Sequence, residues 1–239
     1  MKKIIYSKFD KHAIGTLPRV CFPGRIITVF TKDDVETAVD YLLASDILGV
    51  DTETRPIFKR GQNYKVSLLQ VSTHDICFLF RLNLTGITPA IIRFLEDTKV
   101  PKIGLSWHDD LLGLQRREKF KPGYFIDLQN IAPKLGIEDK SLQKLYANVF
   151  HEKISKSQRL TNWAADQLKE AQKMDAATDA WTCINLYEEI QRLLKTHDYQ
   201  LIKVPDPVVV PASSVSDIDS SDTSIPDETA GTGQIVKEI

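Results

Sequence analysis

Two acidic residues, Asp51 and Glu53, stand two positions apart at the end of the apolar segment ILGVDTETRP. Alternate residues of a strand point to the same face, so both carboxylates are expected on one side of a sheet. Carboxylates that leave a buried strand are unfavourable unless a cation joins them, and carboxylate oxygens are the ligands that Mg²⁺ and Mn²⁺ prefer. The pair predicts half of a divalent metal site, or else a strand end that reaches solvent.

Two further aspartates have settings that could complete such a site. Asp110 opens a predicted helix in KIGLSWHDDLLGL, where the helix dipole favours a carboxylate, although its neighbour Asp109 competes for the role and either could be a cap. Asp179 lies in a predicted long helix between Ala176 and Ala180, small residues that let a helix approach a sheet or simply help it pack. Two divalent ions about 3.5 to 4 Å apart can activate water and hold the leaving oxygen of a phosphodiester. The implied chemistry is phosphodiester hydrolysis.

The composition bounds the size and class of the protein. A chain of 239 residues with 42% hydrophobic residues can build one substantial α/β domain. Its three cysteines, Cys21, Cys77 and Cys183, lack the spacing of a zinc or redox centre and are expected to be reduced thiols. The N-terminal apolar stretch is too short for a signal peptide, and no run could span a membrane. We therefore expect a cytoplasmic protein with no membrane partner.

Charge divides the chain into a body and a tail. From Pro205 to Ile239 there is one basic residue against seven acidic ones, a net charge of −6, which leaves +5 on the remaining residues. The tail is rich in Ser, Asp, Pro, Thr and Gly and is predicted to be disordered. The expected organisation is an N-terminal extension over 1–24, a folded domain over 25–204 and a disordered acidic tail over 205–239. A mildly positive body suits a polyanionic substrate.

Strands and helices alternate in the body, as hydrophobic periodicity shows. Strands are expected over 24–30, 47–53, 65–73, 75–80 and 100–106, with a short extended segment over 125–128. Helices are expected over 32–45, 88–97, 108–117, 129–136, 141–150 and 168–195. This order predicts an α/β fold in which a mixed β-sheet is flanked by helices.

The acidic residues and the segments between them resemble a known family. The chain is similar to the DEDD superfamily of 3′-5′ exonucleases, within it the ribonuclease D and Werner-type branch. The likeness runs from about Arg25 to Glu189 and includes LLQVST, FIDLQNIAPKLGI, SLQKLYANVF and KISKSQRLTNWAADQLKEAQ. The resemblance implies a ribonuclease H-like fold and a two-metal exonuclease that uses Mg²⁺ or Mn²⁺ to release nucleoside monophosphates from the 3′ end of DNA or RNA.

The resemblance also implies the role of each acid. Asp51 would bridge both metals, and Glu53 and Asp179 would complete the site of the metal that generates the hydroxide. Asp110 would hold the second metal, largely through water. It is preferred to Asp109 because the family's acid falls eight residues after the lysine that opens the strand, here Lys102.

One position departs from the family. This branch has a tyrosine four residues before the last aspartate, whose hydroxyl positions the attacking water, and Asp175 takes its place here. Residues at i and i+4 share a helix face, so Asp175 should face the same site as Asp179. It could be a substitute base, a further metal ligand or a lesion. A second hypothesis follows, namely a catalytically weakened nucleic-acid-binding or scaffold protein with the exonuclease fold.

Basic and aromatic residues near the acids could contact a nucleic acid with a free 3′ end. The basic candidates form two groups, or else solvated surface: Arg55, Lys59, Arg60 and Lys65 after the first motif, and Lys153, Lys156 and Arg159 before the last helix. Phe58, Tyr64 and Trp163 could stack on terminal bases, although core packing is the favoured role of Trp163. His108 is not assigned a catalytic role. Protein partners are not indicated by the sequence.

Overall fold

The structure is a computed structural model that describes residues 2–59 and 61–205. Residues Met1–Val204 form one compact unit. The predicted disorder of the acidic tail concerns residues that lie almost wholly outside the described part, and Arg60 also lies outside it. Among the described helices, none has both the length and the apolar character needed to cross a membrane.

A six-stranded mixed sheet forms the centre of the fold, in the order β2-β5-β4-β3-β6-β7. Its strands are β2 (Arg25–Val29), β3 (Leu48–Glu53), β4 (Leu68–Ser72), β5 (Ile76–Phe80), β6 (Lys102–Gly104) and β7 (Phe125–Asp127). Strand β4 runs antiparallel to β3 and β5, whereas the pairs β2–β5, β3–β6 and β6–β7 are parallel. The predicted mixed sheet is confirmed, and β3, which ends in Asp51 and Glu53, lies inside it.

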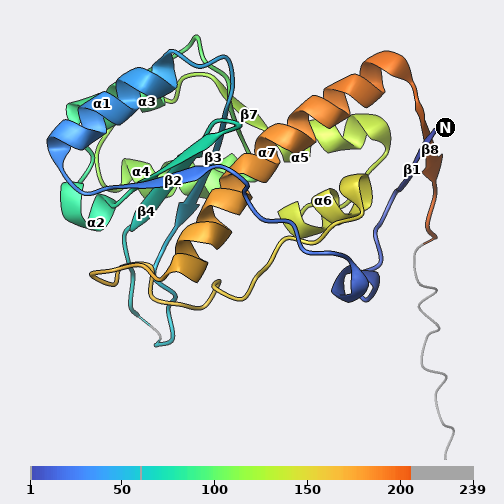
Figure 1. The fold of residues 1–239 in the computed structure, drawn as a ribbon, viewed down its shortest axis with the longest axis horizontal. Coiled ribbons are helices and arrows are strands. Elements are labelled where there is room, and N and C mark those ends of the chain that lie inside the picture. The colour runs from blue at the N-terminus through green and yellow to red at the C-terminus, as the bar shows by residue number, and fades with distance from the viewer. Residues whose placement is uncertain (1, 60, 206–239) are drawn as a thin grey trace, which may run out of the picture. The chain divides into compact units, whose positions relative to one another are not determined.

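Helices cover both faces of this sheet (Figure 1). Helices α1 (Lys32–Leu43) and α3 (Pro89–Glu96) pack against each other, and each begins after a threonine whose hydroxyl accepts a backbone N–H. The long helix α7 (Glu170–Thr196) packs against β3, β4, β5 and β6. The remaining helices are η1 (Ala13–Thr16), α2 (Leu82–Thr85), α4 (Trp107–Gln115), α5 (Leu128–Ile131), η2 (Ala132–Leu135) and α6 (Leu142–Phe150).

Side chains alternate along β3 between two environments. Leu48 and Val50 are buried in the core cluster that includes residues of α1 and α3. Gly49 and Asp51, which alternate with these residues, face α7 instead. A Cβ atom on Gly49 would lie 1.9 Å from the carbonyl oxygen of Ala180 in α7. Glycine on the strand and alanine on the helix therefore allow the close approach that brings their acidic residues together.

The first residues of the chain are part of the compact unit. Strand β1 (Lys3–Tyr6) pairs in parallel with β8 (Tyr199–Ile202), and together they form a separate two-stranded sheet. Ile5 is fully buried in the cluster that contains Ile190 and Leu193 of α7. The sequence analysis set residues 1–24 apart as an N-terminal extension, and the structure packs β1 of this segment against the rest of the compact unit. Four-residue strands from opposite ends of the compact unit carry too little periodicity for their pairing to be predicted.

Candidate active site

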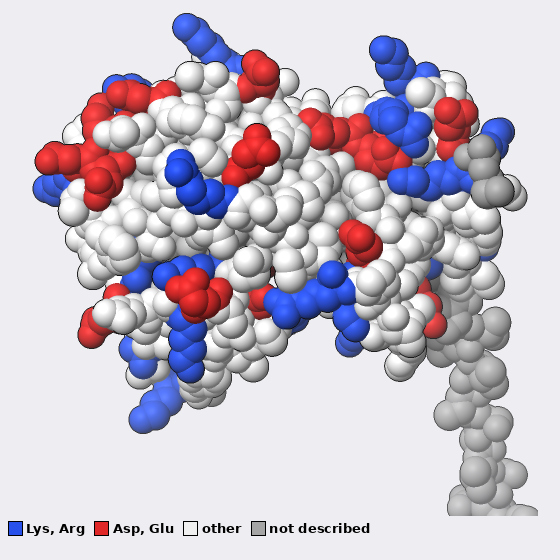
Figure 2. Space-filling view, viewed as in Figure 1, with Lys and Arg blue, Asp and Glu red and all other residues white. Residues whose placement is uncertain are grey.

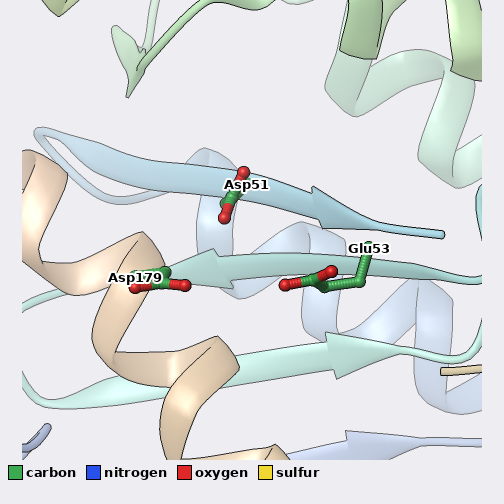
Figure 3. Close-up of side chains that lie close together, drawn as sticks. All are labelled: Asp51, Glu53 and Asp179. Carbon is green, nitrogen blue, oxygen red and sulfur yellow. The ribbon is translucent and has the colours of Figure 1, made fainter. Parts of the chain in front are cut away.

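Three carboxylates meet between the sheet and helix α7. Asp51 and Glu53 come from β3 and Asp179 from α7, and one ligand atom from each lies within 4.8 Å of the others. Figure 3 shows the side chain of Asp179 extending from the helix toward the two acids of the strand. We call Asp51, Glu53 and Asp179 the carboxylate cluster. It unites three of the four residues that were predicted to bind metal.

Burial and mutual repulsion raise the pKa of every carboxyl group in the carboxylate cluster. Burial raises the pKa of Asp51 to about 7, with a smaller contribution from the charge of Asp110. The pKa of Glu53 rises to about 9 through burial and then through the charges of Asp51 and Asp179. The pKa of Asp179 is raised well above its ordinary value by burial and by the charge of Asp51. A cation would offset these costs, so the donor set fits a hard divalent metal ion.

Asp110 lies beside the carboxylate cluster but is not one of its three members. It is half-buried in the first turn of α4, where it accepts a hydrogen bond from the hydroxyl of Thr52, and burial raises its pKa. Asp109 is exposed to solvent. The contribution of Asp110 to the raised pKa of Asp51 is consistent with two nearby carboxylates. A role in binding the second metal through water stays a prediction.

The turn that leads into α4 is held by Asp127, a residue that the sequence analysis did not single out. The carboxylate of Asp127 accepts hydrogen bonds from the backbone N–H groups of Ser106 and Trp107, both at 3.0 Å. Ser106 has a φ of 62°, in the left-handed region, so this turn needs outside support. Asp127 therefore fixes the start of the helix that carries Asp110. Its position at the end of a strand, directly before a helix, is the signal that could have identified it.

Asp175 has a partner of opposite charge. Its buried carboxylate accepts a hydrogen bond from Nη2 of Arg19 at 2.9 Å and one from the hydroxyl of Ser157 at 3.4 Å. Asp175 and Asp179 line the same cavity, as the shared helix face predicted. The sequence did not indicate Arg19 as a partner of Asp175, because it lies 156 positions before Asp175, in the segment taken for an extension.

A cavity of about 470 Å³ opens over the carboxylate cluster, within the size range of about 300 to 1,000 Å³ that is usual for ligand sites. Acidic, basic and amide side chains share its lining. They are Asp51, Glu53, Asp175 and Asp179, with Lys140, Lys156 and Arg159 and with Gln129, Gln143 and Gln158. The cavity combines a site for cations with positive charges that could meet a polyanion.

The predicted basic residues fall into three positions. Lys156 and Arg159 line the cavity together with Lys140, which the sequence analysis missed. Arg55, Lys59 and Lys65 are exposed on the segment that follows β3 and are not among the lining residues. The backbone of Lys153 pairs with residues 18–20. Figure 2 shows Lys and Arg side chains gathered along the lower edge, where Figure 1 places the segments after β3 and before α7.

The other aromatic and polar candidates have distinct settings. Trp163 is 1% exposed and belongs to the core cluster of Leu68 and Ala176, which confirms the predicted core role, and it also lies on the lining of the cavity. Phe58 is 75% exposed, and His108 is also exposed.

Gln70 of β4 lies opposite Asp51 and is fully buried, and neither of its amide atoms has a hydrogen-bond partner among the described residues.

Comparison with known proteins adds independent findings. A sequence model described as "3'-5' exonuclease" matches residues 26–195. The chain is 30% identical over 187 residues to the mouse bifunctional 3'-5' exonuclease/ATP-dependent helicase WRN, an alignment that covers 74% of this chain and 13% of that protein. The chain thus spans only a small part of the length of this relative.

Solved structures share the fold. The EXO domain of Nibbler from Aedes aegypti superposes with a TM-score of 0.66 at 20% identity, over 73% of this chain and 91% of that one. The Trypanosoma brucei RNase D in complex with RNA U12 gives a TM-score of 0.61 at 18% identity, over 71% of this chain and 63% of that one. These likenesses confirm the ribonuclease H-like fold that the resemblance implied.

Proposed function

Because the chain belongs to the 3′-5′ exonuclease family, we propose that it hydrolyses phosphodiester bonds from the 3′ end of DNA or RNA. The observation that carries the proposal is the half-buried carboxylate cluster on the lining of a cavity that also has basic side chains on its lining. Clustered carboxylates with raised pKa values are unfavourable as structural elements but suit a site that binds cations.

The chain supplies residues for two Mg²⁺ or Mn²⁺ ions. Asp51 would contact both ions, Glu53 and Asp179 would complete one site, and Asp110, held by Thr52, would serve the other through water. When bound, such ions activate water and stabilise the leaving oxygen of a phosphodiester. The protein orients the ligands from a rigid strand and a rigid helix, while Lys140, Lys156 and Arg159 would bind the phosphates of the strand.

The proposed substrate is RNA or DNA. The complex of a related fold with RNA supports the first, and the family membership supports a nucleic acid with a free 3′ end in general. The second candidate function, a binding protein with weakened catalysis, rests on Asp175 in place of the family's tyrosine. Since the carboxylate cluster is complete, hydrolysis is the function that we propose first.

An assay with single-stranded DNA and RNA, labelled at the 5′ end, tests the proposal. We expect a ladder that shortens from the 3′ end with Mg²⁺ or Mn²⁺, no reaction in EDTA, and no reaction on a strand with a blocked 3′ end. Asp51→Asn and Asp179→Asn should each abolish the ladder, because a metal ligand loses its charge. Activity that survives in both variants would overturn the assignment.

Matched variants of two neighbours test the role of Asp110. Asp110→Asn should reduce turnover by about tenfold or more, on the scale of one lost electrostatic contact in a transition state. Asp109→Asn changes the same charge on an adjacent exposed residue and should leave turnover unchanged. Equal rates for the two variants would show that Asp110 does not serve the metal site.

A further inference from the structure

The N-terminal segment reaches the candidate active site and is fixed there at two points. The backbone N–H of Val20 donates to the carbonyl of Lys153 at 3.0 Å, and that of Lys153 donates to the carbonyl of Pro18 at 2.8 Å. Three residues further on from Arg19, the N–H of Phe22 donates to the hydroxyl of Thr178 at 3.0 Å. Thr178 directly precedes Asp179 on α7, so Arg19 is held between the segment before α7 and the helix itself.

The side chain of Arg19 approaches the cavity through its ion pair. Its Nη2 lies 2.9 Å from Oδ1 of Asp175, which lines the cavity and whose side chain is only 6% exposed. The arginine side chain is 47% exposed, and Asp175 is its one side-chain partner among the described residues. A guanidinium has five N–H donors, so a single hydrogen bond to Asp175 leaves further donors for a ligand.

The ion pair with Arg19 also explains how the carboxylate of Asp175 is held. One of its oxygens accepts from Arg19 and the other from Ser157, so both are engaged by protein donors. Its charge is one of the causes that raise the pKa of Glu53 and of Asp179, which makes a nearby positive charge favourable. In the structure the carboxylate of Asp175 thus contacts a guanidinium and a hydroxyl group and does not stand free.

We propose that Arg19 binds a phosphate group of the nucleic-acid strand at the edge of the cavity, and that Asp175 is the positioning residue that holds the guanidinium there. Planar guanidinium groups bind phosphate oxygens through paired N–H donors, and a buried carboxylate fixes their orientation. This inference rests on the proposed function, since it needs a nucleic acid in the cavity. It gives the N-terminal segment a part in substrate binding in addition to its part in the fold.

Binding of a fluorescein-labelled single-stranded oligonucleotide in EDTA, followed by anisotropy, tests the proposal without hydrolysis. Arg19→Ala should weaken binding by about five- to tenfold, the scale of a lost charged hydrogen bond at a half-exposed site. The slope of log affinity against log salt should fall by about 0.7, as for one lost phosphate contact on a single strand. The control is Arg192→Ala, since Arg192 is 46% exposed and pairs with Glu189 on the same helix. This variant loses the same charge and should bind within about twofold of the parent.

A role for Asp175 in positioning predicts non-additive effects. Asp175→Asn should weaken binding in the parent and should add little in the Arg19→Ala background, because it acts through the arginine. If Asp175→Asn weakens binding equally in both backgrounds, Asp175 does not act through Arg19. If Arg19→Ala lowers the melting temperature but binds like Arg192→Ala, the ion pair is structural only and the proposal is overturned.

Two measurements keep the outcomes separate. Should Arg19→Ala fail to fold, Arg19→Lys and Arg192→Lys replace the two variants: a selective loss of affinity in Arg19→Lys supports the phosphate contact, and equal affinities refute it. Hydrolysis by the parent with Mn²⁺ is measured in parallel. A parent that binds but does not hydrolyse contradicts the proposed function while the comparison of Arg19 with Arg192 still decides the inference. A parent that hydrolyses but does not bind in EDTA contradicts the inference alone, and a parent that neither binds nor hydrolyses contradicts both.

Discussion

At the scale of single residues, the carboxylate cluster lowers the stability of the metal-free protein and suits the binding of a cation. Asp51, Glu53 and Asp179 are held within ligand distance of one another in a half-buried site, and their raised pKa values mean that the folded chain resists their ionisation. Residues that were selected for packing alone would not gather in this way. The cluster therefore lowers the stability of the metal-free protein and stabilises it when a cation binds.

Asp51→Asn should stabilise the metal-free protein. The substitution keeps the volume of the side chain and removes one of the charges that repel Glu53 and Asp179. At pH 8 in EDTA, we expect a gain of about 1 kcal/mol or more, and each 1 kcal/mol corresponds to a melting temperature higher by about 2 to 4 °C. Asp109→Asn is the control and should leave melting unchanged. A fall of several degrees in Asp51→Asn would show that this carboxylate is structural.

The glycine in β3 gives a second prediction for a single residue. In Gly49→Ala the added Cβ meets the carbonyl of Ala180 at 1.9 Å, so strand or helix must move. We expect a loss of about 3 kcal/mol, or about 6 to 12 °C in melting temperature. Gly15→Ala is the matched control, because nothing lies within 4 Å of its added Cβ. An unchanged melting temperature in Gly49→Ala would contradict the close packing of β3 on α7.

At the scale of the elements, strong periodicity made most of the fold predictable. The helix expected over 168–195 is α7 (Glu170–Thr196), and the strand expected over 47–53 is β3 (Leu48–Glu53). Long amphipathic or apolar runs with caps leave little choice of structure. Asp51 and Glu53 were predictable because they end a strand, Asp110 because it lies in the first turn of a helix, and Asp179 because small residues surround it in a long helix. Lys140 lines the cavity and Arg19 pairs with Asp175 through tertiary packing that no local pattern records.

Strand β1 gives the prediction at this scale. If β1 belongs to the core, Ile5→Ala should cost about 2 to 5 kcal/mol, because Ile5 is fully buried against α7. Ile4 is its neighbour in the same strand and is 44% exposed, so Ile4→Ala should change stability by less than about 0.5 kcal/mol. Urea unfolding measures both variants. Equal and small effects would show that the first residues are an appendage after all.

At the scale of the whole molecule, the fold places opposite charges close together around one cavity. The carboxylate cluster lies on its lining together with Lys140, Lys156 and Arg159, and Arg19 pairs with Asp175, another lining residue. Such a cavity attracts divalent cations and phosphates at once, since each partner lowers the cost of binding the other. The segments that supply these residues come from both ends and from the middle of the compact unit.

The pH dependence of stability should therefore depend on the metal. In the unfolded chain Asp51 and Glu53 lose their protons near their ordinary pKa values of 3.8 and 4.5, whereas the folded chain keeps them until about pH 7 and about pH 9. Between these limits the folded state binds more protons, so the stability of the metal-free protein falls as the pH rises from about 4 to about 9.

A bound cation reverses this trend, because it favours the ionised carboxylates. Melting temperatures in EDTA and in saturating Mn²⁺ should differ little at pH 5, and the difference should grow through pH 7 to pH 9. Asp51→Asn should flatten the curve in EDTA and reduce the gain from Mn²⁺, since it removes both a titrating group and a metal ligand. If the parent in EDTA becomes more stable between pH 5 and pH 9, relative to Asp51→Asn, the carboxylate cluster does not hold its protons in the folded state. The site would then be an open, solvated group of acids, poorly suited to the metal chemistry that we propose.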